Sequence, residues 1–239
     1  MNNHFYQITS LHLQLKVRKI MADSKDYIFK NTNGKLDFIG DFEGFYQADE
    51  DPWCQSGQGD MARYYQKSRQ RILNKIDNKE EKSLIIEVGC GLGHFTNQIK
   101  VHHPTSEVFG VDLSQTAITK AQKLFSDPNF FVCNAKELSS QFSRKTVDVV
   151  ILNQLLWYIV DDIEETLASI RAVLKQNGLL IISNAFAREQ KYGLEKLPYF
   201  DGTQRFLANM NEWQLISAEY YDDNETHTDG HFQMRPFHE

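Results

Sequence analysis

The stretch Leu84–Thr96, LIIEVGCGLGHFT, constrains the fold of this chain more than any other segment. Its β-prone apolar residues lead to Glu87, the glycine-rich run Gly89–Gly93 follows, and a helical pattern begins at Phe95. Glycines admit positive φ and let a ligand approach the backbone, while a helix N-terminus offers free N–H groups. This strand, glycine turn and helix predict a ligand site at the carboxyl end of a parallel strand, where open α/β sheets bind nucleotides.

Strands and helices alternate regularly after Ser83. Apolar runs predict strands at Leu84–Val88, Glu107–Asp112, Asn129–Cys133, Thr146–Leu152 and Gly178–Ser183. Helical spacing predicts helices at Gly93–His102, Ser114–Phe125 and Asp161–Lys175. Ser114 is the expected N-cap of its helix, and Asn177-Gly178 is the expected stop of the last helix. Because parallel strands need long crossovers, this order predicts a parallel sheet built from βαβ units.

The C-terminal part of the chain follows a different pattern. A short helix is expected at Gly202–Met210, followed by strands at Trp213–Tyr221 and His231–Phe237 that are joined by the turn-rich segment Asp222–Gly230. The two strands predict an antiparallel hairpin at one edge of the sheet. We therefore expect an α/β fold, a Rossmann-like three-layer sandwich with a mostly parallel seven-stranded sheet.

The N-terminal part of the chain predicts a separate unit. We expect residues 1–59 to be an extension and possible lid, with residues 1–20 poorly ordered or loosely docked, and residues 60–239 to form the main domain. The aromatic-rich segment Asp41–Gly57 either covers a core face or closes over a ligand cleft, with Trp53 and Tyr46 as the candidate lid residues. A helix with 3–4 spacing follows from Met61 to Ile76, with Asp60 as the expected N-cap.

Composition excludes several classes of partner. The formal charge is −6, which argues against a nucleic-acid backbone as the main partner. The three cysteines form no CxxC pair, which favours a reducing cytoplasm without a disulfide framework or zinc site. His227 and His231 are four residues apart but are separated by Gly230, so we expect no metal. No apolar stretch approaches the roughly 18 residues of a membrane span, so no membrane partner is expected.

The acids near the glycines indicate the kind of ligand. A dinucleotide fingerprint has the spacing GxGxxG, whereas this turn is GxGxG with His94 at the place of the third glycine. Asp112 ends the second strand, 19 residues after Gly93, where a carboxylate can bind ribose hydroxyls. Glu87 would repel a pyrophosphate and suits a ligand with an ammonium or sulfonium group. A nicotinamide oxidoreductase is therefore a minor alternative.

Five ordered segments resemble the class I S-adenosylmethionine-dependent methyltransferases: ExGxGxG, GVDLS, CNAKEL, VDVVILNQLLWYI and LKQNGLLIISN. The resemblance covers roughly residues 83–185. It implies a site for S-adenosylmethionine, with S-adenosylhomocysteine as product. Its first motif implies a cradle for the methionine part, made by Glu87, Gly89, Cys90, Gly91 and Gly93. It further implies ribose binding by Asp112, adenine contacts from Leu113, Asn134 and Ala135, and Asn153 and Leu155 near the sulfonium. Asn134 departs from the family's usual Asp, although its amide oxygen can still accept a hydrogen bond.

A looser resemblance carries the expectation about the acceptor. Asp51–Trp53, the stretch after the fourth strand and the tail resemble the nodulation-type sugar N-methyltransferases. This implies methyl transfer to an N or O atom of a small molecule, with a sugar or saccharide precursor as the acceptor. The alternative is a cofactor-binding protein of the same fold without transfer activity. The oligomeric state is left open.

Further candidates come from residues placed near the expected cleft. Tyr158 is the candidate catalytic residue, with packing in the core as the alternative. Arg63 or Arg69 could pair with the cofactor carboxylate, and Tyr64 and Trp53 are candidates for the same region or for a lid. His94 is interpreted as a cofactor neighbour or surface group more readily than as a base.

Overall fold

The computed structural model describes residue 24 and residues 27–33, 35–58, 61–76, 82–224 and 228–237. The predictions for residues 1–20, for Asp60 as a helix N-cap and for His227 lie outside these described residues.

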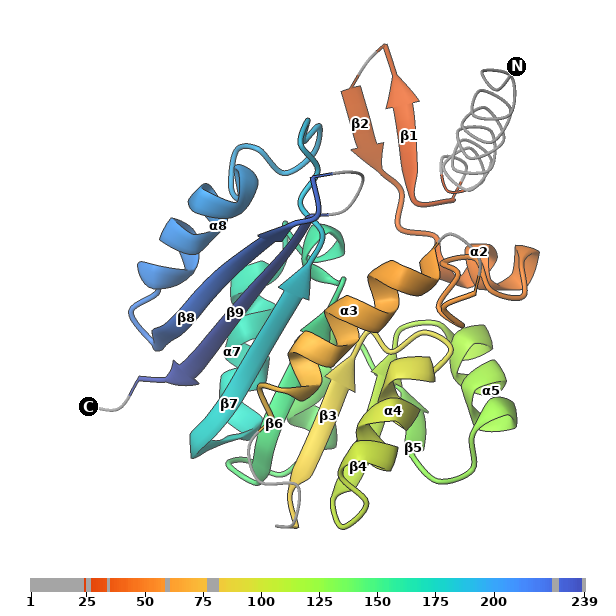
Figure 1. The fold of residues 1–239 in the computed structure, drawn as a ribbon, viewed down its shortest axis with the longest axis vertical. Helices are drawn as coiled ribbons and strands as arrows, with labels where there is room; N and C mark the ends of the chain where they lie inside the picture. The colour runs from red at the N-terminus through yellow and green to blue at the C-terminus, as the bar shows by residue number, and fades with distance from the viewer. Residues whose placement is uncertain are drawn as a thin grey trace, which may run out of the picture.

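A seven-stranded sheet forms the centre of the fold (Figure 1). Its strand order is β5-β4-β3-β6-β7-β9-β8. The strands are β3 (Leu84–Val88), β4 (Glu107–Asp112), β5 (Asn129–Val132), β6 (Val147–Asn153), β7 (Leu174–Asn184), β8 (Trp213–Asp222) and β9 (Thr228–Pro236). The first five in this list pair in parallel, whereas β9 is antiparallel to β7 and to β8. The predicted mostly parallel sheet with a C-terminal antiparallel hairpin is confirmed.

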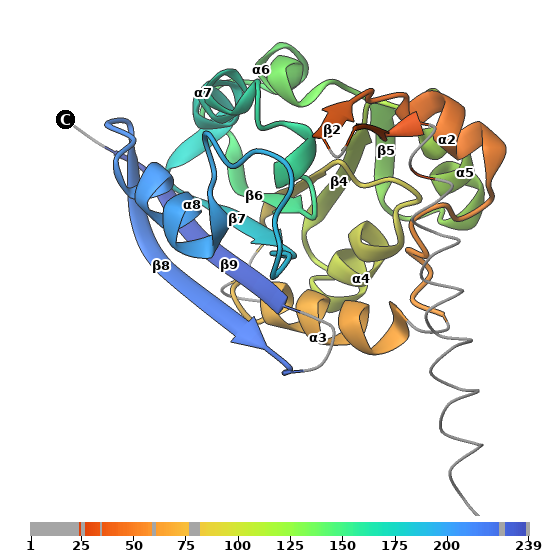
Figure 2. The same ribbon diagram turned by 90° about the horizontal axis from the view of Figure 1, so that it is seen from above.

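Helices cover both faces of the sheet, as the view from above shows (Figure 2). One face carries α3 (Ala62–Leu73), α4 (His94–His102) and α5 (Gln115–Leu124). The other carries α6 (Leu138–Gln141), α7 (Ile163–Val173) and α8 (Tyr199–Ala208). Successive residues of β3 face opposite sides of the sheet. Ile85 packs in the hydrophobic core with Ile72 and Ile99, while Ile86 packs in the other core with Leu167. Burial on both faces explains why this strand is a continuous apolar run.

The start of β7 differs from the sequence prediction. The helix expected over Asp161–Lys175 ends at Val173, and Leu174 already pairs with Val147 in the sheet. Asn177-Gly178 therefore lies inside β7 and is not a helix stop. The buried Leu174 enters the sheet directly after the helix, and a register shift between Val147 and Val149 accommodates the exposed residues that follow.

The N-terminal segment contains regular structure that the sequence analysis did not predict. Strands β1 (Phe29–Thr32) and β2 (Lys35–Phe38) form an antiparallel pair, and α2 (Phe42–Ala48) follows. Asp41 caps α2 by accepting a hydrogen bond from the backbone N–H of Gly44 at 2.8 Å. Figure 1 places this segment above the carboxyl ends of the parallel strands.

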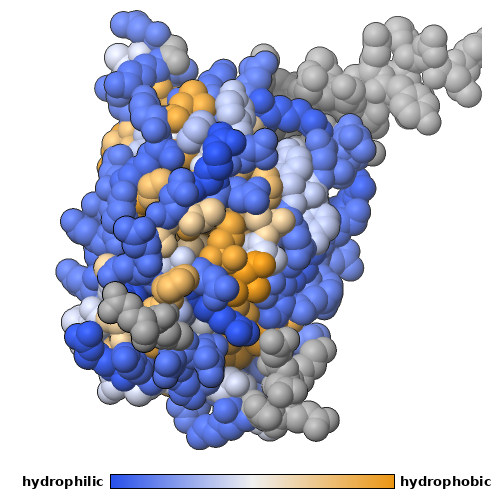
Figure 3. Space-filling model, turned by 90° about the vertical axis from the view of Figure 1, so that its left-hand side faces the viewer, coloured by the Kyte–Doolittle hydropathy of each residue, from blue (hydrophilic) through white to orange (hydrophobic). Residues whose placement is uncertain are grey.

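The edge strand β8 and helix α8 form the side of the molecule shown in Figure 3. Apolar surface gathers in the middle of this face and is surrounded by hydrophilic residues. Ile216 and Tyr220 of β8 are each 45% exposed. The short 3-10 helices η2 (Ala135–Glu137) and η3 (Leu156–Tyr158) follow β5 and β6 and lead toward the site described next.

Candidate active site

A cavity of about 310 Å³ lies at the carboxyl ends of the parallel strands, beneath the N-terminal segment. It brings together residues from β3, from the glycine turn and from the segments that follow β4, β5 and β6. The predicted site residues that line it are Trp53, Arg69, Glu87, Gly89, Cys90, Asp112, Leu113, Asn134, Ala135, Asn153, Leu155 and Tyr158.

The glycine turn brings backbone to the cavity wall. The N–H groups of Gly89 and Cys90 donate to the carbonyl of Val111, at 2.8 and 3.0 Å, which ties the turn to β4. Gly89 has φ +73°, and a Cβ there would lie 2.7 Å from a Leu155 methyl carbon. Only glycine avoids both the backbone strain and the contact. Gly91 and Gly93 shape the turn without lining the cavity.

Glu87 is a buried carboxylate at the end of β3, with 2% of its surface exposed. It accepts hydrogen bonds from Thr96 Oγ1 at 2.5 Å and from Asn153 Nδ2 at 3.4 Å. Burial raises the pKa of Glu87 to about 7, although the Thr96 hydrogen bond, the charge of Arg69 and the Asn153 hydrogen bond oppose the rise. A cation placed beside this group would restore its charged form.

Asp112 stands at the end of the neighbouring strand β4 and is 8% exposed. Its Oδ2 accepts from the N–H of Gly91 at 2.8 Å and its Oδ1 from the N–H of Ser114 at 2.9 Å. Burial raises the pKa of Asp112 above its ordinary value, although the hydrogen bonds from backbone N–H groups oppose the rise. These bonds hold the carboxylate in a fixed orientation at the cavity wall.

Arg69 reaches the cavity from α3 and is 5% exposed. One guanidinium nitrogen donates to the carbonyl of Gln55 at 2.6 Å, and the guanidinium carbon lies 4.3 Å from the centre of the Tyr65 ring. Its Nε has no hydrogen-bond partner among the described residues. Burial lowers the pKa of Arg69, and the charge of Glu87 opposes this.

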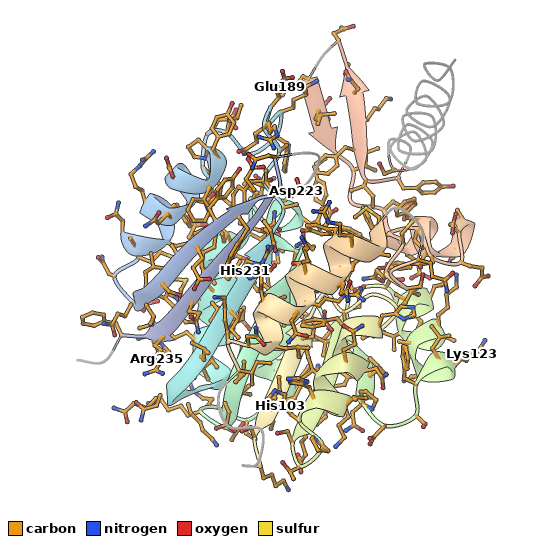
Figure 4. The ribbon with its side chains drawn as sticks, in the orientation of Figure 1. His103, Lys123, Glu189, Asp223, His231 and Arg235 are labelled. Carbon is orange, nitrogen blue, oxygen red and sulfur yellow. The ribbon has the colours of Figure 1, made fainter. Side chains whose placement is uncertain are left out.

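The structure separates Arg63 and Tyr64 from this cavity. They line a second hollow between α3 and the end of β8. There Arg63 lies 3.9 Å from Asp223, which Figure 4 labels. A helix turns by about 100° per residue, so Arg63 and Arg69 project from different sides of α3. Arg63 and Tyr64, which were expected near the cofactor, therefore line this second hollow and not the cavity at the glycine turn.

Segment 41–57 combines the two roles left open by the sequence. Phe45 and Tyr46 are buried, and Tyr46 packs with Leu92 and Ala117. Trp53 lines the cavity, and Gln55 Oε1 accepts from the N–H of Leu92 at 2.8 Å. The segment therefore covers core surface and lies over the glycine turn at the same time.

Glu43 fastens this segment to α5. Its carboxylate accepts from Ser114 Oγ at 2.7 Å and from Thr116 Oγ1 at 2.5 Å. These hydrogen bonds, that of Thr116 first, lower the pKa of Glu43 to about 2. Lys120 Nζ donates to the carbonyls of Tyr46 and Asp49, at 2.8 Å each.

The residues expected near the adenine also line the cavity. Asn134 caps η2 by accepting from the N–H of Lys136 at 3.0 Å, and Ala135 follows it. Leu113 is 53% exposed at the cavity rim. His94 packs against Phe125, with ring centres 5.3 Å apart, and does not line the cavity.

Several lining or supporting residues were not predicted from the sequence, namely Phe38, Phe42, Glu43, Gln55 and Thr96. Of these residues, only Thr96 could have been predicted from the sequence. A helix that begins after the glycine turn brings its first turn back toward Glu87, the acid that precedes the glycines. The others come from segments without periodicity.

The described residues contain no group of three or more His, Cys, Asp or Glu side chains that could hold a metal ion. His231, labelled in Figure 4, is fully buried with Nε2 2.7 Å from Asp229 Oδ2. Within the same part of the chain, no helix combines the length and the apolar character needed to cross a membrane.

Comparisons with known proteins show what part of this chain is similar to. Residues 86–182 match the family model described as a methyltransferase domain. The chain is 34% identical over 111 residues to malonyl-[acyl-carrier protein] O-methyltransferase of Halalkalibacterium halodurans. That match covers 45% of this chain and 41% of the relative, so the chain spans less than half of the relative's length.

Solved structures share the fold at low identity. A protein of Pyrococcus horikoshii OT3 superposes with a TM-score of 0.62 at 19% identity, covering 82% of this chain and 100% of that one. Geranyl diphosphate C-methyltransferase of Streptomyces coelicolor A3(2), solved with S-adenosyl-L-homocysteine, gives a TM-score of 0.58 at 12% identity. The match covers 74% of this chain and 82% of that one.

The architecture of the sheet and its flanking helices is therefore that of a Rossmann-like methyltransferase fold. Residues 86–182 are similar to a methyltransferase domain, and one solved structure that shares the fold was determined with S-adenosyl-L-homocysteine.

Proposed function

We propose that this chain transfers a methyl group from S-adenosylmethionine to an N or O atom of a small molecule. One observation carries the proposal: Glu87 and Asp112 end adjacent parallel strands and line one cavity on either side of a glycine turn. A buried acid next to the turn suits a cationic ligand, and the second acid suits a ribose.

The residues present fit the cofactor. A Cβ at Gly89 would collide with Leu155, so this position stays glycine and leaves its backbone bare at the cavity wall. A ligand can therefore contact the backbone of Gly89 and Cys90 directly. Glu87 would face its ammonium or sulfonium group, and Asp112 its ribose hydroxyls. The unpartnered Nε of Arg69 is a buried donor suited to its carboxylate. The remaining proposed contacts are Leu113, Asn134 and Ala135 at the adenine, and Asn153 and Leu155 at the reactive end.

When bound, S-adenosylmethionine supplies a methyl carbon already activated by a sulfonium leaving group. The protein then has to align the acceptor and exclude water. Trp53 and the rest of the 41–57 segment cover the site, in keeping with residues 1–59 as an N-terminal extension and lid on the domain at 60–239. Burial holds the pKa of Tyr158 above its ordinary value, so its hydroxyl stays protonated. We assign Tyr158 a role in holding the acceptor.

We further propose a sugar or saccharide precursor as the acceptor. The aromatic side chains at the cavity offer flat faces for a sugar ring, and the resemblance to the sugar N-methyltransferases points the same way. The acidic charge disfavours nucleic acid. The three free cysteines favour the cytoplasm.

Calorimetric titration with S-adenosylmethionine and S-adenosylhomocysteine tests the cofactor site. We expect saturable binding of both by the native protein, with loss of binding in Glu87→Gln. An exposed control, Glu107→Gln, should bind as the native protein does, since Glu107 pairs with Lys82 at the end of β4 that lies away from the cavity. Absence of binding by the native protein would refute the proposal. Binding without turnover of any sugar, amine or hydroxyl compound would favour a cofactor-binding protein without transfer activity.

A further inference from the structure

Four aromatic side chains from separate segments meet at the cavity wall: Phe38, Phe42, Trp53 and Tyr158. Tyr158 is at their centre, with its ring centre 5.5 Å from that of Trp53, 5.3 Å from that of Phe42 and 6.4 Å from that of Phe38. We call these four residues the aromatic wall. It lies under the β1–β2 hairpin, which contributes Phe38, and beside Asn153 and Leu155, which also line the cavity.

The positive charges that line the cavity are already engaged. Among the described lining residues the lysines and arginines are Arg69 and Lys136. Arg69 is bound to Gln55 and faces the proposed cofactor carboxylate. Lys136 Nζ lies 3.0 Å from Asp162 and 3.6 Å from Glu165. An acceptor carboxylate at the aromatic wall would find no cation, and a buried unpaired anion is costly.

The described lining also lacks the imidazole and phenolate groups that often take a proton from a hydroxyl. It includes no histidine. Burial raises the pKa of Tyr46, Tyr65 and Tyr158. A phenol with a raised pKa is a donor and not a base at neutral pH.

The acids of the lining are held by other partners. Glu87 accepts from Thr96 and Asn153, Asp112 accepts from two backbone N–H groups, and Asp162 is paired with Lys136. Hydroxyl acceptors benefit from a general base, whereas a neutral amine carries its own lone pair and needs none.

Resting on the proposed methyl transfer, we propose that the acceptor atom is an amine nitrogen and that the aromatic wall selects it. Aromatic faces attract cations, so the wall favours the positive charge that develops on nitrogen as the methyl group is transferred. The amine enters uncharged, releasing its proton to water, because apolar surroundings and the neighbouring sulfonium both disfavour an ammonium. The nitrogen lone pair then forms the N–C bond, while the C–S bond breaks and its electron pair stays on sulfur. One positive charge passes from sulfur to nitrogen beside the same rings.

A matched acceptor panel tests the inference. The probes are 2-phenylethylamine, 2-phenylethanol and 3-phenylpropanoate, each incubated with S-adenosylmethionine and analysed by mass spectrometry for a methylated product. We expect methylation of the amine alone, at a rate that rises about tenfold per pH unit below the amine pKa because only the neutral form reacts. Preferential methylation of the alcohol or the carboxylate would overturn the inference.

A binding experiment keeps the inference testable if none of these probes is turned over. The complex with S-adenosylhomocysteine is titrated with choline and with 3,3-dimethylbutan-1-ol, its uncharged isostere. We expect choline to bind about tenfold more tightly, with that preference reduced in Trp53→Leu and kept in Trp53→Phe. Phe237→Leu is the control, because Phe237 is 54% exposed and lies outside the cavity. Equal binding of the two probes, or no binding of choline, would contradict the amine assignment.

The two proposals fail in different ways. If S-adenosylmethionine itself does not bind, the proposed methyl transfer fails. If the cofactor binds and the cation preference is missing, only the amine assignment fails.

Discussion

Replacing Glu87 by Gln should stabilise the protein without cofactor near neutral pH while it removes cofactor binding. Glu87 is buried at the end of β3, and burial raises its pKa from 4.5 to about 7. The native state therefore holds a proton on Glu87 between these two pH values, whereas the unfolded chain does not. The stability contributed by this proton is complete below pH 4.5 and is lost as the pH rises through 7.

The magnitude follows from the size of the pKa change. A rise from 4.5 to about 7 corresponds to about 3 kcal/mol at about 1.4 kcal/mol per unit. Gln has no charge to bury and can still accept from Thr96, so Glu87→Gln should gain up to about 3 kcal/mol at pH 8 and little near pH 4.5. For a chain of this size that is roughly 6–12 °C in melting temperature.

Thermal unfolding at pH 5 and pH 8, with and without S-adenosylmethionine, measures the effect. The gain of the variant over the native protein should be larger at pH 8. The native protein should also bind cofactor roughly tenfold more weakly at pH 6 than at pH 8, since Glu87 must be charged to bind a cation. Glu107→Gln, at an exposed site on β4, should show neither trend. Equal destabilisation of Glu87→Gln at both pH values would refute the reasoning.

Three further outcomes are expected. Gly93→Ala should cost about 2 kcal/mol or more in urea unfolding, because Gly93 has φ +74° and a Cβ there would lie 2.5 Å from the Phe130 ring; an unchanged midpoint would contradict this. Glu43→Gln should lower hydrogen-exchange protection of the α2 amides about tenfold by weakening charged hydrogen bonds to Ser114 and Thr116. This effect should be complete above pH 4.5 and decline progressively as the pH falls from 4.5 to about 2. Tyr158→Phe should keep turnover within about threefold, because the ring and not a base acts there; loss of a limb of the pH–rate profile would assign Tyr158 a proton-transfer role.

The cofactor half of the site could be predicted because its determinants are local. Glu87 and the glycines occupy one short stretch, and strand alternation places the end of β4, with Asp112, beside the end of β3. Parallel strands buried on both faces are visible as apolar runs. The prediction failed where tertiary packing overrides local propensity. Leu174 enters β7 directly after α7, although the polar residues that follow it in the sequence have the composition of a helix end.

The acceptor half is different in kind, since its determinants lie far apart in the sequence. Phe38, Phe42 and Trp53 meet Tyr158 more than a hundred residues later, and no periodicity links them. Glu43, next to Phe42, ties α2 to the start of α5 through a contact that spans 71 residues between Glu43 and Ser114. A loosened α2 would carry Phe42 away from Tyr158 while leaving Glu87 and Asp112 in place. Acceptor selection should therefore respond to changes at the α2–α5 contact that leave cofactor affinity unaltered.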